Sequence, residues 1–301
     1  MRIAVLDDIH GAYEGTPGVA RLRRRAEVVI FQQKETVERL RDFDALVANR
    51  ERTRFTRELL GALPQLRIIA QTGNHAYHID LAAAAEREVI VARATGGFSY
   101  GAAELAIAFA LALMRQIPAA DAAMKRGEWR TPMTRVLHNK TLGIVGLGHV
   151  GRHVATLARA FGMQVQSWSR IATPAALDAL LETSDVVSIH ATLSPQTRGL
   201  IDARRLALMK PTAYLINTAR GAIVDEAALV SVLKQGRIAG AGLDVFAEEP
   251  LPAGHPLAQL PNVVLTPHIG WPTDEAYERF ADAAADVILA WLDGQDVPRF
   301  E

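Results

Sequence analysis

The stretch from Lys140 to Gly151 constrains the fold more than any other part of the chain. Leu142 to Val145 is a short apolar run typical of a buried parallel strand, and it leads directly into Gly146-Leu-Gly148-His-Val-Gly151, after which apolar residues recur at helical spacing. Strand, glycine turn and helix in this order predict a dinucleotide site. In such a site Gly146 allows a tight turn, Gly148 lets a pyrophosphate approach the backbone, and Gly151 lets the helix pack close to its strand.

The end of the next predicted strand bears on the choice of cofactor. Val165 to Arg170 lies about twenty residues beyond the glycines, where an NAD site carries Asp or Glu for the ribose 2′-hydroxyl. Ser169 and Arg170 stand there instead. Because a guanidinium can bind a 2′-phosphate that a carboxylate would repel, we expect NADP to be preferred. NAD remains the alternative if Arg170 is only a solvated charge.

Length and composition narrow the class of protein. A chain of 301 residues is about twice the usual domain length, and half of its residues are hydrophobic, enough for two cores. Lys+Arg and Asp+Glu balance at 33 each, so we expect neither a nucleic-acid nor a membrane partner. The absence of cysteine excludes disulfides, a thiolate nucleophile and cysteine-based metal sites, and suits a cytoplasmic location. The chain begins directly with the strand-like Arg2 to Asp7, so no signal segment is expected, and no metal site is predicted.

Short β-prone runs alternate with segments long enough for helices along the whole chain. The predicted strands are 2–7, 28–31, 45–48, 67–71, 89–92, 142–145, 165–168, 186–190, 213–217, 238–243 and 263–266. This alternation predicts an α/β fold of two Rossmann-like modules with doubly wound parallel sheets and a cleft between them. We expect a flavodoxin-like, substrate-binding module at 1–97 plus 273–301 and a dinucleotide-binding Rossmann module at 98–272.

Three helices are expected to matter for this organisation. Lys34 to Asp42 combines a charged face with two apolar positions. The alanine-rich segment from Ala102 to Arg126 joins the modules, with a break or kink at Pro118. The amphipathic segment from Thr273 to Leu292 is expected to cross back onto the first module, which makes that module discontinuous.

Three polar stretches follow predicted strands of the second module. They are Asn217-Thr-Ala-Arg220-Gly221, Asp244-Val-Phe-Ala-Glu-Glu249-Pro250 and Thr266-Pro-His268-Ile-Gly270. Ligands of open α/β sheets bind outside the carboxyl ends of the strands, so a guanidinium, a carboxylate and an imidazole are expected at the same edge as the nicotinamide. Taken singly, each residue has an ordinary structural alternative, such as a surface ion pair or a loop residue bonded to backbone.

The order GLGHVG, NTARG, DVFAEEP and TPHIG resembles the D-isomer-specific 2-hydroxyacid dehydrogenase family, which includes the glyoxylate/hydroxypyruvate reductases. The resemblance extends from Arg67-Ile-Ile-Ala-Gln-Thr-Gly73 to His268. It implies hydride transfer between a nicotinamide cofactor and a small 2-keto or D-2-hydroxy acid. In this chemistry Arg220 holds the carboxylate and polarises the carbonyl, and His268 donates a proton. Glu249 contacts the imidazole and favours its protonated form.

Further contacts are assigned by position along the same motifs. Asp244 resembles the residue that contacts the nicotinamide carboxamide, with a turn cap as its alternative. On the substrate side, the backbone of Gly73, Asn74 and His75 resembles the family's carboxylate-binding stretch, and Arg50 or Arg52 adds a second positive charge or lies on a solvated loop face. The other residues assigned to the cofactor are Ser99, His149, Val150, Thr192 and Thr218.

Departures from the family pattern concern both the substrate and the cofactor. Phe98 stands where many relatives carry a polar Asn, which puts polar substrates such as phosphorylated acids in doubt. The segment 170–177 is shorter than in most relatives, so a more open wall is expected beside the adenosine ribose. Glyoxylate and hydroxypyruvate therefore fit best, and we expect a homodimer joined through the cofactor modules. A dinucleotide-sensing corepressor on the same fold is the alternative from another class. A formate or phosphite dehydrogenase is a third possibility, although formate enzymes of the family are typically longer.

Overall fold

The computed structural model describes residues 1–73, 75–96, 99–129 and 131–300, and the chain divides into two compact units. Unit 1 consists of Met1–Phe98 and Pro272–Glu301, and unit 2 of Ser99–Trp271. The boundaries expected from the sequence were 1–97 plus 273–301 and 98–272. The assignment of substrate binding to unit 1 and of dinucleotide binding to unit 2 stays a prediction.

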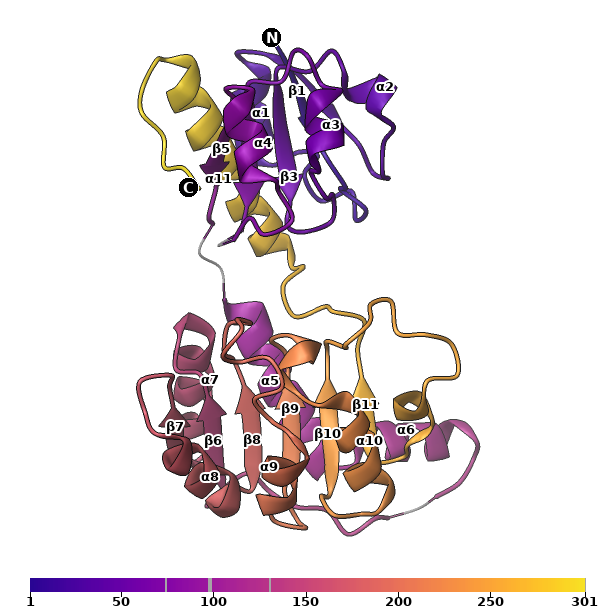
Figure 1. Cartoon of the computed structure of the whole chain (residues 1–301). Helices are drawn as coiled ribbons and strands as arrows, with labels where there is room; N and C mark the ends of the chain where they lie inside the picture. Colours follow the sequence, from indigo (N-terminus) through magenta and orange to yellow (C-terminus); the bar gives the residue numbers. More distant parts are fainter. Residues whose placement is uncertain (74, 97–98, 130, 301) are drawn as a thin grey trace. The chain divides into compact units, whose positions relative to one another are not determined.

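Unit 1 is built on a five-stranded parallel sheet in the order β2-β1-β3-β4-β5 (Figure 1). Its strands are β1 (Arg2–Val5), β2 (Glu27–Ile30), β3 (Ala45–Asn49), β4 (Ile68–Thr72) and β5 (Ile90–Arg93). Its helices are α1 (Pro17–Arg23), α2 (Val37–Leu40), α3 (Arg57–Gly61), α4 (Leu81–Glu86) and α11 (Asp274–Leu292). Each strand lies within two residues of its prediction, because a fully buried parallel strand must be a short apolar run.

The predicted helix from Lys34 to Asp42 is wrong in its length. Only α2 is helical, and the chain enters it from Thr36, which is extended with φ −81° and ψ 158°. Leu40 is the one buried residue of this helix, so the segment has no continuous apolar face to pack on the core. A helix of this length is not stable in water without such packing, and most of the charged segment remains loop.

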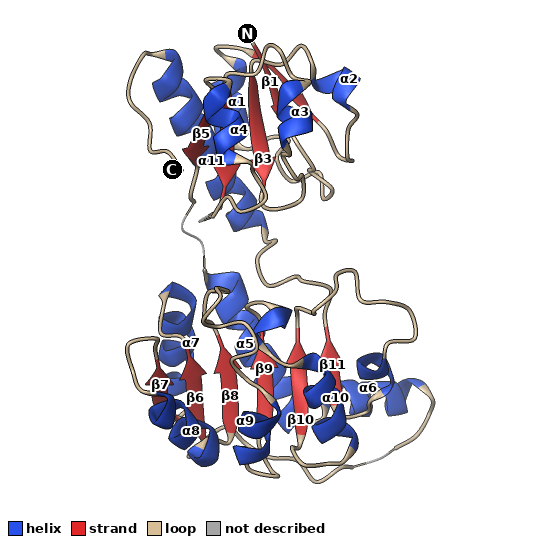
Figure 2. Ribbon diagram, in the orientation of Figure 1, coloured by secondary structure: helices blue, strands red, loops and turns tan. Residues whose placement is uncertain are grey.

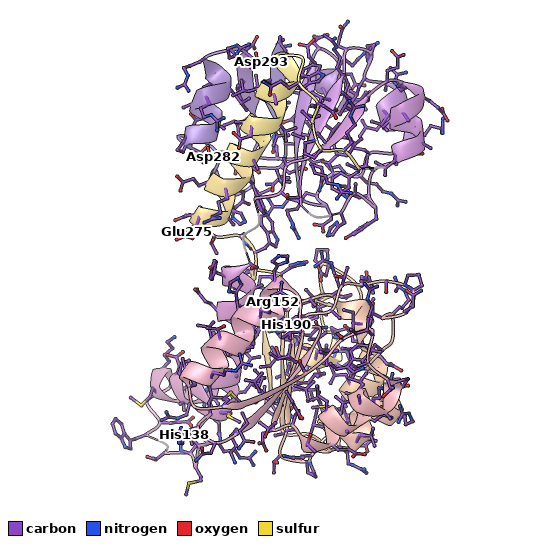
Figure 3. All side chains as sticks on the ribbon, turned by 90° about the vertical axis from the view of Figure 1, so that its left-hand side faces the viewer. His138, Arg152, His190, Glu275, Asp282 and Asp293 are labelled. Carbon is purple, nitrogen blue, oxygen red and sulfur yellow. The ribbon has the colours of Figure 1, made fainter. Side chains whose placement is uncertain are left out.

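The C-terminal helix α11 packs against α1 and β4 within unit 1. A Cβ added to Gly18 of α1 would lie 2.3 Å from the backbone of Ala281, so the two helices approach to backbone contact. Arg25 pairs with Asp293 at 2.9 Å across this contact, and Figure 3 labels Asp293 on α11. Helix α11 therefore completes the layer of helices that packs on the sheet of unit 1.

Unit 2 contains a six-stranded parallel sheet in the order β11-β10-β9-β8-β6-β7. Its strands are β6 (Thr141–Val145), β7 (Gln164–Trp168), β8 (Val186–Ile189), β9 (Tyr214–Asn217), β10 (Gly240–Leu243) and β11 (Val263–Leu265). Its helices are α5 (Tyr100–Met114), α6 (Ile117–Lys125), α7 (His149–Ala160), α8 (Pro174–Thr183), α9 (Ala203–Leu208) and α10 (Glu226–Lys234), with 3-10 turns η1 (Gly221–Ile223) and η2 (Pro256–Gln259). The strand order changes direction between β6 and β8, where ligands of open α/β sheets bind.

Alternate residues of these strands point to opposite faces of the sheet, and each face has its own core. Tyr214 and Ile216 of β9 pack with α5 and α7, whereas Leu215 packs with α8, α9 and α10. Figure 2 shows helices on both sides of the red strands of unit 2. The doubly wound α/β class expected from the sequence is confirmed for both units.

The predicted break in the alanine-rich helix is present, two residues before the expected position. Helix α5 ends at Met114, Gln116 adopts a left-handed φ of 53°, and α6 continues at an angle of 62°. Pro118 lies in the first turn of α6, where backbone N–H groups make no hydrogen bond within the helix. A proline, which lacks the N–H, is therefore tolerated there and favours the start of a new helix. Among the described residues no single helix is long and apolar enough to cross a membrane, although the bent pair α5 and α6 meets that test jointly.

Candidate active site

The glycine loop after β6 forms an open cradle at the start of α7. Gly146 has φ 101°, and an added Cβ would lie 2.6 Å from the backbone nitrogen of Ala191 in the loop after β8. At Gly151 an added Cβ would lie 2.3 Å from the carbonyl oxygen of Gly146. At Gly148, by contrast, a Cβ would meet nothing within 4 Å. The free amides of this helix N-terminus therefore face open space, which fits a pyrophosphate.

Arg152 also lies at this cradle, although it is not among the residues predicted from the sequence. It stands in the first turn of α7, and its Nη1 donates to the carbonyl oxygen of Leu147 at 3.2 Å (Figure 3). A basic residue directly after the third glycine was the available signal, but a surface arginine on a helix is common.

The loop after β7 places Ser169 and Arg170 at the same sheet edge. Ser169 is half-buried, and its carbonyl oxygen accepts from Ala172 N at 2.9 Å in a tight turn before α8. Arg170 is exposed and makes no hydrogen bond or ion pair with another residue of the described ranges. Its charge is available to a ligand.

The remaining cofactor candidates differ in their surroundings. The Thr218 hydroxyl is buried and has no hydrogen-bond partner in the described part of the chain. Thr192 and His149 are exposed, and Val150 packs on the core beneath α7. Ser99 precedes α5 and makes no capping hydrogen bond with its side chain.

The loop after β9 is shaped by Asn217. Its side chain donates to the carbonyl oxygen of Arg220 at 2.9 Å and accepts from Ala219 N at 3.0 Å. At Gly221 an added Cβ would lie 2.0 Å from the backbone of Phe246, so the loop after β9 touches the loop after β10. This contact, which the sequence pattern could not reveal, brings Arg220 toward the segment that carries Glu249.

His268 and Glu249 form a direct pair. Nδ1 of His268 lies 2.7 Å from Oε2 of Glu249, and Oε1 accepts from Phe246 N at 3.0 Å. Burial raises the pKa of Glu249, but the hydrogen bonds from His268 and Phe246 and the charges of His268 and Arg220 outweigh it and hold this pKa below its ordinary value. The carboxylate is therefore ionised near neutral pH and can stabilise an imidazolium.

Asp244 organises the loop that carries His268. Its Oδ1 accepts from Thr266 Oγ1 at 2.5 Å and from Ile269 N at 2.7 Å, and its Oδ2 accepts from Gly270 N at 2.9 Å. Burial raises the pKa of Asp244 despite these hydrogen bonds. Within the chain, Asp244 therefore acts as a turn cap, which was the alternative to its role in cofactor binding. A contact with the nicotinamide carboxamide would be additional to these hydrogen bonds.

His190, the other histidine at a strand end of unit 2, has a different environment. It is half-buried beside the Ser188 hydroxyl, which lies 2.8 Å from its Nε2 (Figure 3). Burial lowers the pKa of His190 to about 4, so its ring is neutral at physiological pH. A neutral ring suits packing rather than proton donation.

The substrate candidates of unit 1 lie after β3 and β4. A Cβ added to Gly73 would lie 3.4 Å from Nη1 of Arg50, so this guanidinium covers the glycine backbone. Arg52 instead donates to the carbonyl oxygen of Asp7 at 2.7 Å and to the Tyr277 hydroxyl at 3.2 Å. His75 Nε2 lies 2.8 Å from Oε1 of Glu51. Asn74 and Phe98 lie outside the described residues.

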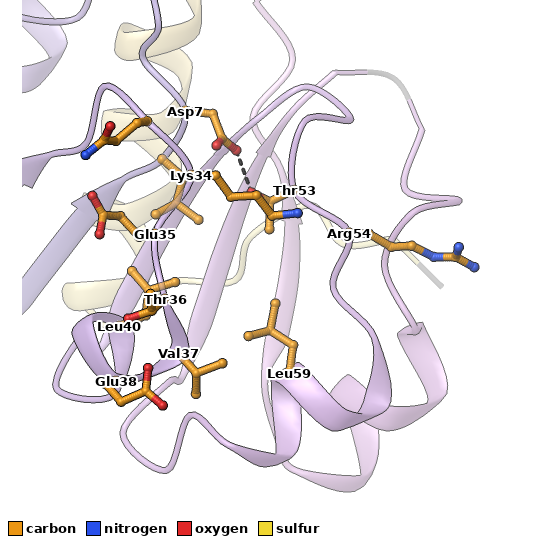
Figure 4. A pocket seen from close by; sticks show the side chains of 12 residues that line it. Asp7, Lys34, Glu35, Thr36, Val37, Glu38, Leu40, Thr53, Arg54 and Leu59 are labelled. Atoms are coloured by element: carbon orange, nitrogen blue, oxygen red, sulfur yellow. Dashed lines mark hydrogen bonds between the residues drawn. The ribbon is translucent and has the colours of Figure 1, made fainter. Parts of the chain in front are cut away.

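A cavity of about 420 Å³ opens elsewhere in unit 1, at the carboxyl ends of β1, β2 and β3 (Figure 4). Thr53 donates to Asp7 at 2.5 Å on its wall, and Lys34, Glu35 and Glu38 bring charges of both signs to it. It contains none of the predicted substrate residues. No group of three or more His, Asp or Glu in the described ranges is arranged to hold a metal.

An open glycine cradle and an imidazole–carboxylate pair at one sheet edge are typical of nicotinamide-dependent oxidoreductases. Residues 107–270 match the family model described as "D-isomer specific 2-hydroxyacid dehydrogenase, NAD binding domain". A glyoxylate reductase of Thermofilum pendens is 39% identical over 306 residues, which cover 94% of this chain and 90% of that protein. A D-3-phosphoglycerate dehydrogenase of Methanocaldococcus jannaschii is 35% identical over 98% of this chain, but the chain spans only 58% of its length.

Two solved structures are similar to this chain over its whole length and contain different nicotinamide cofactors. A D-lactate dehydrogenase with NAD+ from Lactobacillus jensenii has a TM-score of 0.83 at 26% identity, with 100% of this chain and 99% of that chain covered. An acyclic imino acid reductase in complex with NADPH and D-Arg has a TM-score of 0.85 at 28% identity, with 100% of both chains covered.

The chain belongs to the D-isomer-specific 2-hydroxyacid dehydrogenase family. It is an oxidoreductase that transfers hydride between a nicotinamide cofactor and a 2-hydroxy acid. The relatives described above are reductases and dehydrogenases, and they give no support to the dinucleotide-sensing corepressor alternative.

Proposed function

We propose that this dehydrogenase reduces a small 2-keto acid, glyoxylate or hydroxypyruvate, with Arg220, Glu249 and His268 as its catalytic residues. The observation that carries the proposal is the 2.7 Å contact between His268 Nδ1 and Glu249, whose pKa is also lowered by the charge of Arg220. An imidazole held by an ionised carboxylate, with a guanidinium nearby, supplies both the acid and the anion-binding group that keto-acid reduction needs.

In this mechanism the bound nicotinamide supplies the hydride that adds to the carbonyl carbon of the substrate. Arg220 binds the substrate carboxylate through its guanidinium and polarises the carbonyl. As negative charge develops on the carbonyl oxygen, His268 donates a proton to it, and Glu249 stabilises the imidazolium before the transfer. In the oxidative direction the neutral imidazole accepts the hydroxyl proton, so the preferred direction depends on pH.

The proposed substrate-binding residues of unit 1 are Gly73, Asn74, His75 and Arg50. The position of the Arg50 guanidinium against Gly73 supports its role as the second positive charge. Arg52 is the weaker candidate, because its Nη1 already donates to Asp7 and Tyr277 within unit 1.

We further propose that NADPH is the preferred cofactor. Support comes from Ser169 in place of a carboxylate and from the exposed Arg170, which pairs with no other described residue. The pyrophosphate would lie over Gly148, where the cradle is open. The other residues proposed to contact the cofactor are Gly146, His149, Val150, Gly151, Thr192, Thr218, Asp244 and Ser99.

A substrate panel tests this function directly. Purified protein is mixed with NADPH or NADH and with glyoxylate, hydroxypyruvate, pyruvate or a larger 2-keto acid, and cofactor oxidation is followed. We expect turnover of the two small acids and a higher kcat/KM with NADPH. Absence of turnover with every acid and both nucleotides would refute the proposal.

A homodimer joined through unit 2 is proposed from its exposed apolar surface. Trp129 and Met133 are 85% and 92% exposed, and Val136, Ile117 and Met124 are also exposed. These exposed apolar side chains all lie within residues 117–136, and a second copy of this chain is the proposed occupant of this surface. Light scattering should give twice the chain mass for the wild type and a lower mass for Trp129→Glu combined with Met133→Glu. A cytoplasmic location also stays a prediction, which cell fractionation would test.

A further inference from the structure

Glu51 links the two loops that carry the proposed substrate residues. Its Oε1 lies 2.8 Å from His75 Nε2 and 3.4 Å from the Tyr77 hydroxyl, both in the loop after β4. Its Oε2 lies 3.5 Å from Nε of Arg50 in the loop after β3. The Glu51 side chain is only 22% exposed, so its charge is held at this place rather than free in solvent.

Backbone contacts fix the arrangement around this carboxylate. The Gln71 side chain donates to the carbonyl oxygens of Arg50 at 3.2 Å and His75 at 3.4 Å, which ties the two loops together. Arg50 N donates to Thr72 Oγ1 at 3.1 Å, and Arg50 adopts a left-handed φ of 58°. Because both loops are bonded to β4, Glu51 cannot swing away from Arg50 without breaking several contacts.

The charge of Glu51 opposes that of the guanidinium at the proposed anion-binding position. Nη1 of Arg50 lies against Gly73, where a substrate carboxylate would bind, and Oε2 of Glu51 lies 3.5 Å from Nε of the same guanidinium. One substrate carboxylate can still be held by the Gly73 backbone and by Arg50. A second anionic group near the same edge would meet a carboxylate within a few ångströms, in a partly desolvated place where the repulsion is strong.

We propose that Glu51 is a specificity-determining residue, which restricts the substrate to 2-keto acids with a single negative charge and rejects phosphorylated or dicarboxylic ones. The inference rests on the proposed function, since it assumes that the loops after β3 and β4 bind the substrate. It does not require a particular small 2-keto acid.

The test uses hydroxypyruvate and 3-phosphohydroxypyruvate, which differ only by the phosphate. The measured quantity is the ratio of kcat/KM for the two acids in the wild type, in Glu51→Gln and in Glu51→Ser. We expect the wild type to favour hydroxypyruvate, and both variants to lower this preference at least tenfold, which corresponds to about 1.4 kcal/mol. The gain should appear mainly as a lower KM for the phosphorylated acid, because repulsion opposes its binding.

Glu58→Gln is the matched control, since Glu58 is an exposed carboxylate of the same unit on α3 and its removal changes the net charge equally. Its ratio should equal that of the wild type. The inference is overturned if the wild type prefers the phosphorylated acid, or if the folded Glu51 variants keep the wild-type ratio. Absence of wild-type turnover with either acid, and with glyoxylate, would instead refute the proposed function. If neither Glu51 variant folds, a wild-type preference for the phosphorylated acid still overturns the inference.

Discussion

Replacing Glu249 with Gln is the sharpest test of the proposed acid. The substitution keeps the size of the side chain and leaves an oxygen that can still accept from Phe246 N, but it removes the charge 2.7 Å from Nδ1 of His268. Protonated His268 then loses its stabilising partner, while the loop that carries residue 249 keeps its backbone contact. The variant thus separates the electrostatic role of Glu249 from its packing.

The expected magnitude follows from the pair's geometry and exposure. A hydrogen bond to a charged group contributes about 1.5–3 kcal/mol. Since the side chains of His268 and Glu249 are 30% and 36% exposed, solvent screening reduces the value, and we use about 1.4 kcal/mol. That free energy corresponds to about a tenfold change in kcat/KM.

The sign follows from the protonation state that the reaction requires. Reduction needs a proton on the imidazole of His268, and the ionised carboxylate of Glu249 stabilises that form. Without the carboxylate the imidazolium is less stable by this free energy, so kcat/KM for keto-acid reduction near neutral pH should fall about tenfold. Because the pKa of Glu249 is held below its ordinary value, the carboxylate of the wild type is charged throughout the neutral range, and the difference should shrink only as the pH falls toward that pKa.

The assay is the pH profile of kcat/KM for glyoxylate or hydroxypyruvate reduction from about pH 5 to about pH 9, followed by NADPH absorbance. Glu248→Gln is the matched control, because Glu248 is the exposed neighbour and loses the same charge. Values of kcat/KM near neutral pH that coincide in Glu249→Gln, Glu248→Gln and the wild type would refute the proposed pairing. A lower denaturant midpoint in Glu249→Gln alone would instead indicate a role in packing.

Three other predictions follow from single contacts. His268→Ala should lower kcat for reduction by about 10²–10⁴-fold, with NADPH affinity measured by fluorescence changed little. Ser169→Asp combined with Arg170→Ala should reverse or strongly reduce the preference for NADPH over NADH in kcat/KM, and an unchanged ratio would exclude these residues from cofactor selection. Gly221→Ala should lower the free energy of unfolding by about 1–3 kcal/mol, because its Cβ would lie 2.0 Å from backbone atoms. Gly148→Ala, whose Cβ would meet nothing within 4 Å, should weaken NADPH binding with little change in the denaturant midpoint of unfolding.

The strands were predictable because burial on both faces leaves a strong local signal. A parallel strand covered by two helical layers must be a short apolar run, and every such run of the chain became a strand within two residues of its predicted ends. The helix predicted from Lys34 to Asp42 is wrong in its length, because the spacing of apolar residues does not show whether the core offers a surface on which the helix can pack. Only one turn, Val37–Leu40, packs on the core there.

Of the contacts that join the loops of the site, the family resemblance implied the one between Glu249 and His268, but not the others. That His268 follows β11 and Glu249 follows β10 was evident from the sequence, and parallel strands place both at one edge. The close approach at Gly221 depends on the path of the loop after β10, which no local pattern specifies. Glu51 was likewise overlooked, because its significance appears only when the loops after β3 and β4 are seen in contact.

The conformation of His268 shows how distant residues determine the geometry of the pair. His268 has a left-handed φ of 57°, which costs a non-glycine residue on the order of 1 kcal/mol. The hydrogen bonds that Asp244 accepts from Ile269 N and Gly270 N, each typically about 1.5–3 kcal/mol to a charged acceptor, are sufficient to offset that cost. The strained turn is therefore stable only while Asp244 is present beneath it. The residue that follows β10 thus positions the imidazole that follows β11, and the proton donor of the proposed reaction depends on a carboxylate that need not touch the substrate.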